Sequence, residues 1–251
     1  VFGLTLGGAD AGNYTLVQPT TAANITPLRL TVAGIAASSR AYDGTATAAL
    51  NTVTAALVGV VSGETVTLDT TGAAGTFADK GIGTAKPVTV TGLTIGGADV
   101  GNYTLVPPTP TANIAPVALT VTGITASNKV YDATSTAALN TVDAALVGGL
   151  SGETVTLDVS GAIGTLADKN VGTAKSVQIS GLTIGGADVG NYTLTQPTAT
   201  ADVTPVGLTV TGVAATSKPY DGNAVAALNT ASAVLVGVLN GDVTLLEVTG
   251  A

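Results

Sequence analysis

The chain contains no cysteine, histidine, methionine or tryptophan among its 251 residues. The missing cysteine excludes a disulfide framework and any catalysis that uses a thiol. The missing histidine excludes Ser-His-Asp and Cys-His sites and removes the usual general base near neutral pH. We therefore expect no enzymatic activity, and we predict no catalytic, cofactor-binding or metal-binding residue.

Charged residues are also scarce, at 10% of the chain, against roughly 25% in an average soluble domain. The formal net charge is −8, and the eight lysines and arginines are scattered. Because phosphate binding needs clusters of basic residues, the chain is not expected to bind nucleic acid. No stretch of about 20 apolar residues free of Thr, Gly, Asn or Asp occurs, so we predict no insertion into a membrane.

The abundant residues favour extended backbone and turns. Thr, Val, Ala, Gly and Leu dominate the sequence. Thr and Val are branched at Cβ and are enriched in strands, while 33 glycines and 10 prolines supply turns. The composition predicts an all-β fold built from short strands.

A period of 89 residues runs through the sequence, and the six tyrosines show it most clearly. The Tyr-Asp tyrosines, each followed by Asp, are Tyr42, Tyr131 and Tyr220; the Asn-Tyr tyrosines, each preceded by Asn, are Tyr14, Tyr103 and Tyr192. The spacing is 89 because 131 − 42 and 220 − 131 both give 89. A fixed period of this size indicates an array of copies of one domain.

The period divides the chain into four parts. Residues 1–27 are the C-terminal part of a repeat, 28–116 (the first repeat) and 117–205 (the second repeat) are complete, and 206–251 (the third repeat) are the N-terminal half of a truncated repeat. The two complete repeats share about 70% of their residues, which is high for neighbours in an array. Each is long enough to bury a core of its own.

Within a repeat, apolar and polar residues alternate with a period of two. Val88 and Val90, for example, share one face of a predicted strand, and turns such as Asp43-Gly44 separate the strands. Residues 45–58 are ambiguous, and we interpret them as strand and loop rather than helix because Thr and Asn interrupt the pattern. Several short strands between turns predict antiparallel β-sandwich or Greek-key domains.

Neighbouring repeats are joined without a flexible spacer. The sequence from Thr111 to Val121 has no stretch rich in Gly or Ser, and Pro116 stiffens it. We therefore predict tandem domains arranged as an elongated rod. With strands of about ten residues along the axis, at roughly 3.3 Å per residue, each repeat would add on the order of 35–40 Å.

Five acidic positions recur between the repeats: Asp43, Glu64, Asp69, Asp79 and Asp99. A pair of carboxylates can serve a glycosidase, but most of these acids lie in turn-like contexts, where Asp usually accepts a hydrogen bond from the nearby backbone. Structural calcium is the one cofactor left to consider, with Asp99 and Asn102 as the best local pair. Two oxygens do not make a site for an ion that takes six to eight.

Lysine and asparagine offer two further possibilities. An isopeptide bond could staple each domain, with Lys80, Lys86, Asn102 and Asp79 as candidates; the alternative is that the lysines are solvated at strand ends. The sequence Asn-Tyr-Thr at Asn102 fits a glycosylation sequon, but we favour a turn, with the asparagine at positive φ or capping and the tyrosine buried. We likewise interpret Tyr42 as a core residue followed by an Asx turn rather than as a ligand-binding residue.

Several motifs in a fixed order resemble a known family. They are Tyr42-Asp43-Gly44, Phe77 to Lys80, Gly83 to Lys86, Gly92-Leu93-Thr94 and Gly96 to Leu105, with Ile25-Thr26-Pro27 at the join. Together they resemble the YDG-domain repeats of large bacterial surface and secreted proteins, including filamentous-haemagglutinin-like adhesins. The resemblance covers essentially the whole chain and implies an extracellular, stalk-like or adhesive role without catalytic residues. Ala133 replaces the glycine of the first motif, so either position 44 needs no positive φ or Ala133 is strained.

We expect a structural stalk or fibre segment, extracellular or on a bacterial cell surface, that projects or spaces other domains. Its partners would be neighbouring repeats of the same chain and other copies in a fibre. A second hypothesis is a multivalent module that binds a host or matrix glycan or protein, which requires an exposed cluster of Tyr, Asp and Asn on every repeat. A third is a self-assembling filament subunit in which a strand of one chain completes a neighbouring chain.

Overall fold

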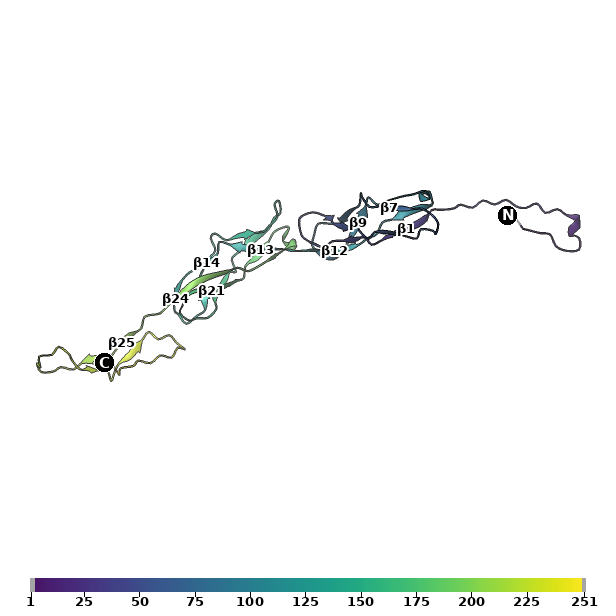
Figure 1. The fold of residues 1–251 in the computed structure, drawn as a ribbon. Coiled ribbons are helices and arrows are strands. Elements are labelled where there is room, and N and C mark those ends of the chain that lie inside the picture. The colour runs from purple at the N-terminus through teal and green to yellow at the C-terminus, as the bar shows by residue number, and fades with distance from the viewer. Residues whose placement is uncertain (1–2, 250–251) are drawn as a thin grey trace. The chain divides into compact units, whose positions relative to one another are not determined.

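The computed structural model describes residues 3–249 and shows the all-β chain that the composition predicts (Figure 1). Helical backbone in this part of the chain is confined to three single turns of 3-10 helix, η1 (Ala11–Asn13), η2 (Val100–Asn102) and η3 (Val189–Asn191). Among residues 3–249, no helix has the length and apolar character needed to cross a bilayer.

The chain folds as two compact units. The first contains residues 3–40 and Thr45–Ile114; the second contains Ala41–Gly44 and residues 115–249. The short segment Ala41–Gly44 thus belongs to the first repeat in sequence but to the second unit in space. It carries Tyr42, the first of the Tyr-Asp tyrosines.

The strands of the first repeat form four small sheets. The three-stranded sheet has the order β11-β1-β6, with β1 parallel to β11 and antiparallel to β6. The five-stranded sheet has the order β3-β12-β9-β8-β4, and the two others pair β10 with β7 and β2 with β5. The bounds are β1 (Leu28–Ala33), β2 (Ala36–Ala37), β3 (Arg40–Ala41), β4 (Thr47–Ala48), β5 (Leu50–Asn51), β6 (Ala56–Val58), β7 (Thr67–Asp69), β8 (Ala74–Phe77), β9 (Gly83–Thr91), β10 (Thr94–Gly96), β11 (Tyr103–Val106) and β12 (Thr111–Ala115).

The second repeat builds the same four sheets with the same pairing. Their orders are β18-β13-β23, β15-β24-β21-β20-β16, β14-β17 and β19-β22. The bounds are β13 (Val117–Thr122), β14 (Thr125–Ala126), β15 (Lys129–Val130), β16 (Thr136–Ala137), β17 (Leu139–Asn140), β18 (Ala145–Val147), β19 (Thr156–Asp158), β20 (Ile163–Leu166), β21 (Gly172–Ser180), β22 (Thr183–Gly185), β23 (Tyr192–Leu194) and β24 (Thr198–Thr204).

The third repeat forms two hairpin-like pairs, β25 (Thr209–Thr211) with β28 (Val234–Val236) and β26 (Ala214–Ala215) with β27 (Leu228–Asn229). The register of β25 on β28, with Thr209 opposite Val236, repeats that of β13 on β18, with Thr120 opposite Val147. The strands in the first half of a repeat therefore pair in the same register whether or not the second half of that repeat is present.

The core of a complete repeat follows the predicted alternation. Leu30 on β1 and Val88 and Val90 on β9 are buried, and Thr89 between the two valines is exposed. Burying side chains of this size stabilises the fold by about 1.5–3 kcal/mol each. In the second repeat the corresponding strands bury two apolar clusters, centred on Val177 and on Ile179.

The ambiguous residues 45–58 are strand and loop, as predicted, since they form β4, β5 and β6. The polar residues that interrupt the pattern make the turn there: Asn51 Oδ1 accepts a hydrogen bond from the backbone N–H of Val53 at 3.1 Å. A side-chain oxygen that bonds the backbone two residues ahead competes with helix and favours a turn.

Ala133 resolves the two alternatives left by its replacement of glycine. Its φ is 64°, in the left-handed region, and Gly44 and Gly222 at the same position have a φ of 77°. The position therefore needs a positive φ, which alanine adopts at a cost of roughly 1–2 kcal/mol. The predicted Asx turn holds it, because Asp132 Oδ1 accepts from the Thr134 N–H at 2.9 Å.

Candidate functional site

Each repeat carries an acidic residue directly after a tight glycine turn. These residues are Glu64, Glu153 and Asp242, spaced by the repeat period. The preceding glycines have a positive φ, 89° at Gly63 and 94° at Gly241. The acid's own N–H donates back to a carbonyl three residues earlier, at 3.1 Å in the first and third repeats and 3.4 Å in the second. Local backbone thus presents all three carboxylates in the same way.

Two tyrosines hold the carboxylate of Glu153 in the second unit. Tyr192 donates its hydroxyl to Glu153 Oε2 at 2.6 Å, and Tyr42 donates its hydroxyl to Oε1. The two rings meet edge to face, with centroids 5.9 Å apart and an interplanar angle of 80°, the arrangement that the ring quadrupoles favour. We call a carboxylate with its bonded tyrosines a tyrosine–acid site.

Both rings of the Glu153 site are buried, and backbone bonds fix them. Tyr42 is 2% exposed and Tyr192 is 6% exposed. The Tyr42 N–H donates to the carbonyl of Ala115 at 2.8 Å, and the Leu150 N–H donates to the Tyr192 hydroxyl oxygen at 3.2 Å. Burial and the hydrogen bond to Glu153 raise the pKa of the Tyr192 phenol, so it stays protonated as a donor.

The Asp242 site repeats this arrangement 89 residues further on. Tyr131 donates its hydroxyl to both carboxylate oxygens of Asp242, at 2.9 and 2.8 Å, and its N–H donates to the Thr204 carbonyl at 2.8 Å. Lys169 takes the place of the second tyrosine, with Nζ 2.7 Å from Asp242 Oδ1. The hydrogen bond from Lys169, followed by that from Tyr131, lowers the pKa of the Asp242 carboxyl.

The same offset relates tyrosine and acid in both sites, since 153 − 42 and 242 − 131 both give 111. The offset exceeds the period of 89, so a Tyr-Asp tyrosine bonds the acid of the repeat that follows its own. Tyr131, in the second repeat, and Asp242, in the third, lie within one compact unit. Within this unit the site therefore joins two successive repeats.

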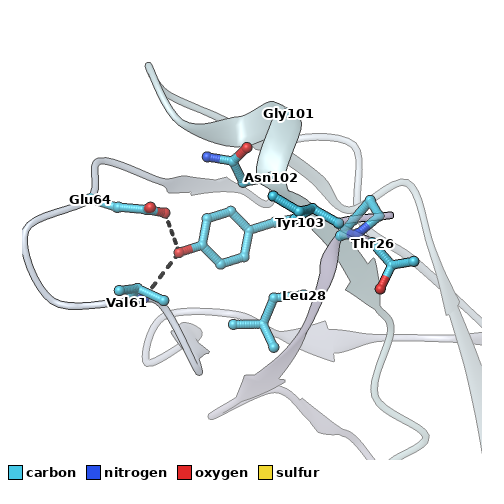
Figure 2. A pocket seen from close by; sticks show the side chains of 9 residues that line it. Thr26, Leu28, Val61, Glu64, Gly101, Asn102 and Tyr103 are labelled. Atoms are coloured by element: carbon cyan, nitrogen blue, oxygen red, sulfur yellow. Dashed lines mark hydrogen bonds between the residues drawn. The ribbon is translucent and has the colours of Figure 1, made fainter. Parts of the chain in front are cut away.

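The Glu64 site in the first unit borders a cavity of about 390 Å³. Tyr103 donates its hydroxyl to Glu64 Oε2, and the Val61 N–H donates to the same hydroxyl oxygen at 3.1 Å (Figure 2). The hydrogen bond to Glu64 is the main cause of a raised pKa at the Tyr103 phenol. Ile25, Thr26, Pro27, Leu28, Gly101 and Asn102 complete the lining (Figure 2).

Asp69 and Asp79 accept hydrogen bonds from the nearby backbone, which confirms the turn interpretation for these two acids. Asp69 accepts from the Thr71 N–H at 2.9 Å, and Asp79 accepts from the Gly81 N–H at 2.8 Å. The bond from Thr71 lowers the pKa of the Asp69 carboxyl. The hydrogen bond from Lys86, followed by that from the Gly81 N–H, lowers the pKa of the Asp79 carboxyl. Glu64 is the acid that departs from this interpretation, since its carboxylate bonds a tyrosine.

The best local pair for calcium is engaged with the backbone. Asp99 Oδ2 accepts from the Thr65 N–H at 2.8 Å, and the Asn102 N–H donates to the Asp99 carbonyl at 3.0 Å. Across residues 3–249, no group of three or more acidic, histidine or cysteine side chains is arranged to hold a metal ion.

The structure corrects the interpretation of Lys86 and decides between the two alternatives for Asn102. Lys86 is not solvated at a strand end: its Nζ bonds the Asp79 carboxylate and lies 2.6 Å from the Gly81 carbonyl, because the loop before β9 folds over it. Asn102 does not adopt a positive φ; non-glycine residues with one are Ala85, Ala133 and Ala174 within residues 3–249. It ends η2 instead, so the predicted turn before the strand is right.

The sequence identified both kinds of tyrosine but not the acid that joins them. Tyr42 and Tyr103 are buried, as predicted. The hydrogen bonds between these tyrosines and the acids were missed. The repeat period links residues at the same position in successive repeats, whereas a tyrosine and its acid stand at different positions of the repeat. A constant offset of 111 between a recurring donor and a recurring carboxylate was the available signal, and many other pairs of recurring positions show constant offsets too.

Fold and site together define a class of protein: a tandem array of all-β repeats in which a tyrosine of one repeat bonds an acid of the next. The YDG domain family matches residues 26–112, 115–201 and 204–251, so the chain belongs to the YDG domain family. No curated protein and no solved structure matches the chain.

Proposed function

We propose that this chain is a structural segment of a bacterial extracellular adhesin, a stalk or fibre of tandem β-sandwich domains that projects or spaces other domains. The observation that carries the proposal is the Asp242 site. There a partly buried hydrogen-bond network joins the second repeat to the third, with Tyr131 and Lys169 on one side and Asp242 on the other. A joint fixed by side chains in this way resists bending, which is what a spacer requires.

The short joins support the same role. A single residue, Pro116, separates β12 from β13. Proline fixes its own φ and restricts the residue before it, so the join has little freedom. An array of similar domains with stiff joins supplies length rather than a reactive centre.

The alternative of a multivalent binding module is less well supported. It requires tyrosines that a ligand can reach on every repeat. Tyr42, Tyr103 and Tyr192 are all buried, and their hydroxyls are bonded to glutamates of the chain itself. These rings therefore contribute to packing rather than to a glycan-stacking surface.

Small-angle X-ray scattering, extrapolated to zero concentration, tests the proposed rod. A compact chain of this length has a radius of gyration of about 18 Å. Repeats that each add about 35–40 Å along one axis would give a value on the order of 30 Å or more. A value near that of a compact particle would contradict the stalk.

A further inference from the structure

The first strand of each complete repeat lies beside one of its last two strands, and the pair is parallel. In the second repeat β13 pairs with β23, and Val117 lies opposite Tyr192. In the first repeat β1 pairs with β11, and Leu28 lies opposite Tyr103. The two ends of a repeat are therefore hydrogen-bonded to each other along parallel strands, although most of the repeat separates them in sequence.

This pairing decides how a repeat meets a pull on its two ends. The chain enters the second repeat at the start of β13 and leaves it at the end of β24, and these strands lie toward opposite ends of the repeat (Figure 1). Tension thus pulls β13 backward along its own axis, while the exit from β24 holds the rest of the repeat. The hydrogen bonds between β13 and β23 cross the direction of the pull, so they are loaded together and not one after another.

The pair cannot slip by a small step. The Thr195 N–H, just beyond β23, donates to the carbonyl of Leu119 at 2.9 Å, and the Leu119 side chain is 0% exposed. A slip of one residue would turn Leu119 to the opposite face of the sheet, so the shortest slip that restores the pattern is two residues, about 6.6 Å. The hydrogen bonds of the pair must break before new ones can form.

A buried tyrosine anchors the second strand of the pair. Tyr192 begins β23 and is 6% exposed. Its hydroxyl donates to Glu153 Oε2 at 2.6 Å and accepts from the Leu150 N–H at 3.2 Å. Tyr103 holds β11 through the same two kinds of bond (Figure 2). The strand that resists the pull is therefore fixed to the turn beside it and does not follow β13.

We propose that these parallel pairs make each complete repeat a load-bearing unit, which resists tension along the chain by shear of β13 against β23 and of β1 against β11. The inference deepens the proposed stalk and rests on it, because a stalk is the kind of segment that is pulled by its ends. It adds mechanical resistance to the role of spacing.

Single-molecule force spectroscopy of the full chain tests the pairs. The chain has no cysteine, so one cysteine added at each end defines the two points of pulling. We expect one unfolding event for each complete repeat. Each event should release a length on the order of 280 Å, which is 89 residues at about 3.6 Å less a folded length of about 35–40 Å.

A second pulling direction separates shear from simple stability. The variant with Ala118→Cys and Gly190→Cys, without the terminal cysteines, is pulled at two points near the start of the pair, where Ala118 lies opposite Thr193. Both introduced positions are exposed, and a Cβ at Gly190 meets nothing within 4 Å. Tension then opens the strands one hydrogen bond at a time, so the second repeat should unfold at a lower force than when it is pulled by the chain ends.

Thr195→Pro tests the pair itself, because it removes the N–H that bonds Leu119, and Thr195 is exposed. Unfolding under force follows the unfolding rate. The loss of one backbone hydrogen bond, about 1 kcal/mol, should therefore make the second repeat unfold about fivefold faster at constant force. The event of the first repeat should stay unchanged and serves as an internal reference.

Ala167→Pro is the matched control. Ala167 is also exposed, and its N–H donates to the Ser176 carbonyl at 3.2 Å, between β20 and β21. This variant should lower stability in urea but leave the unfolding rate under force unchanged, since its hydrogen bond stays intact until the pair has sheared.

Equal forces in the two pulling directions would overturn the proposal, and so would equal acceleration by Ala167→Pro and Thr195→Pro. The comparison of directions needs no proline variant, so it decides the matter even if Thr195→Pro does not fold. Scattering measures the rod without force, and a compact particle would contradict the stalk while leaving the result on the parallel pairs intact.

Discussion

Leu119 and Leu208 occupy the same position of the period, one in the second repeat and one in the third, and only the first is buried. Leu119 is 0% exposed and Leu208 is 39% exposed. Both lie at the start of a repeat, where β13 pairs with β18 and β25 pairs with β28 in the same register. The hairpin is therefore the same in the two repeats, while the burial differs.

The difference comes from the second half of the repeat. In the second repeat, β13 also pairs in parallel with β23, more than 70 residues further along the chain. Within residues 206–249 of the third repeat, the strands are β25 to β28. Strand pairing is thus a local property of the first half, and burial of the core depends on contacts with the second half.

The largest expected effect is on the core. Leu119→Ala should destabilise the second repeat by about 2–5 kcal/mol, because it removes a fully buried side chain and leaves a cavity. Leu208→Ala should cost much less, since its side chain already meets solvent. Amide hydrogen exchange, read residue by residue, would measure both changes in one experiment. Equal losses of protection would show that the third repeat also has a packed core.

The next largest effect is the loss of stability caused by replacing a hairpin glycine, and it should be equal in the second and third repeats because its cause is local. Gly123 and Gly212 both have a φ of 80°, and a Cβ on either would lie 1.9 Å from a carbonyl oxygen in the turn before β18 or β28. Alanine at either position should cost more than about 2 kcal/mol from the backbone conformation and the clash together. Amide exchange of β18 and β28 would report it. Gly190→Ala is the control, since a Cβ there meets nothing within 4 Å.

The join between the repeats gives a smaller effect. Tyr131→Phe removes the hydroxyl that bonds Asp242, and amide exchange around Asp242 and in β28 should become faster. Tyr220→Phe should leave exchange unchanged, because that ring is exposed. If Tyr131→Phe has no effect, the hydrogen bond does not hold the third repeat on the second.

The Glu153 and Asp242 sites should lose their stabilising hydrogen bonds at opposite ends of the pH scale. The Asp242 pKa is lowered by Lys169 and Tyr131, so its stabilisation is present above the unfolded value of about 3.9 and is lost as the pH falls through the lowered pKa. The Tyr192 pKa is raised by burial and by Glu153. Its stabilisation is present below about pH 10 and is lost as the pH rises through the raised value. Amide signals near each site, followed against pH, should change at opposite extremes.

The smallest effect concerns the turn after each Tyr-Asp tyrosine. Ala133→Gly should stabilise the second repeat by roughly 1 kcal/mol, because the position has a φ of 64° and glycine adopts it without the Cβ penalty. Gly222→Ala should have the opposite sign and a similar size, since a Cβ there meets nothing within 4 Å and only the backbone is strained. Urea denaturation of paired variants would measure both. Equal signs would contradict the shared conformation.

Much of the fold could be predicted from the sequence because its determinants are local. Alternation places Val88 and Val90 in the core, and glycine or Asp-Gly positions place the turns, since few other residues adopt a positive φ. Positive φ values at Ala85 and Ala174 could not be predicted, because alanine gives no such signal. Each sits at a register shift between β-strands, where a neighbouring side chain, Asn113 or Asp202, accepts from its N–H at 2.7 Å.

The sequence alone determined the period, the all-β class and the position of several strands and turns, because these depend on residues a few positions apart. Only the tertiary structure decided which half of a repeat completes the core, and that Tyr42 and Tyr131 each bond an acid 111 residues further on. Such a contact depends on how two whole repeats meet in space, and no short stretch of sequence contains both partners.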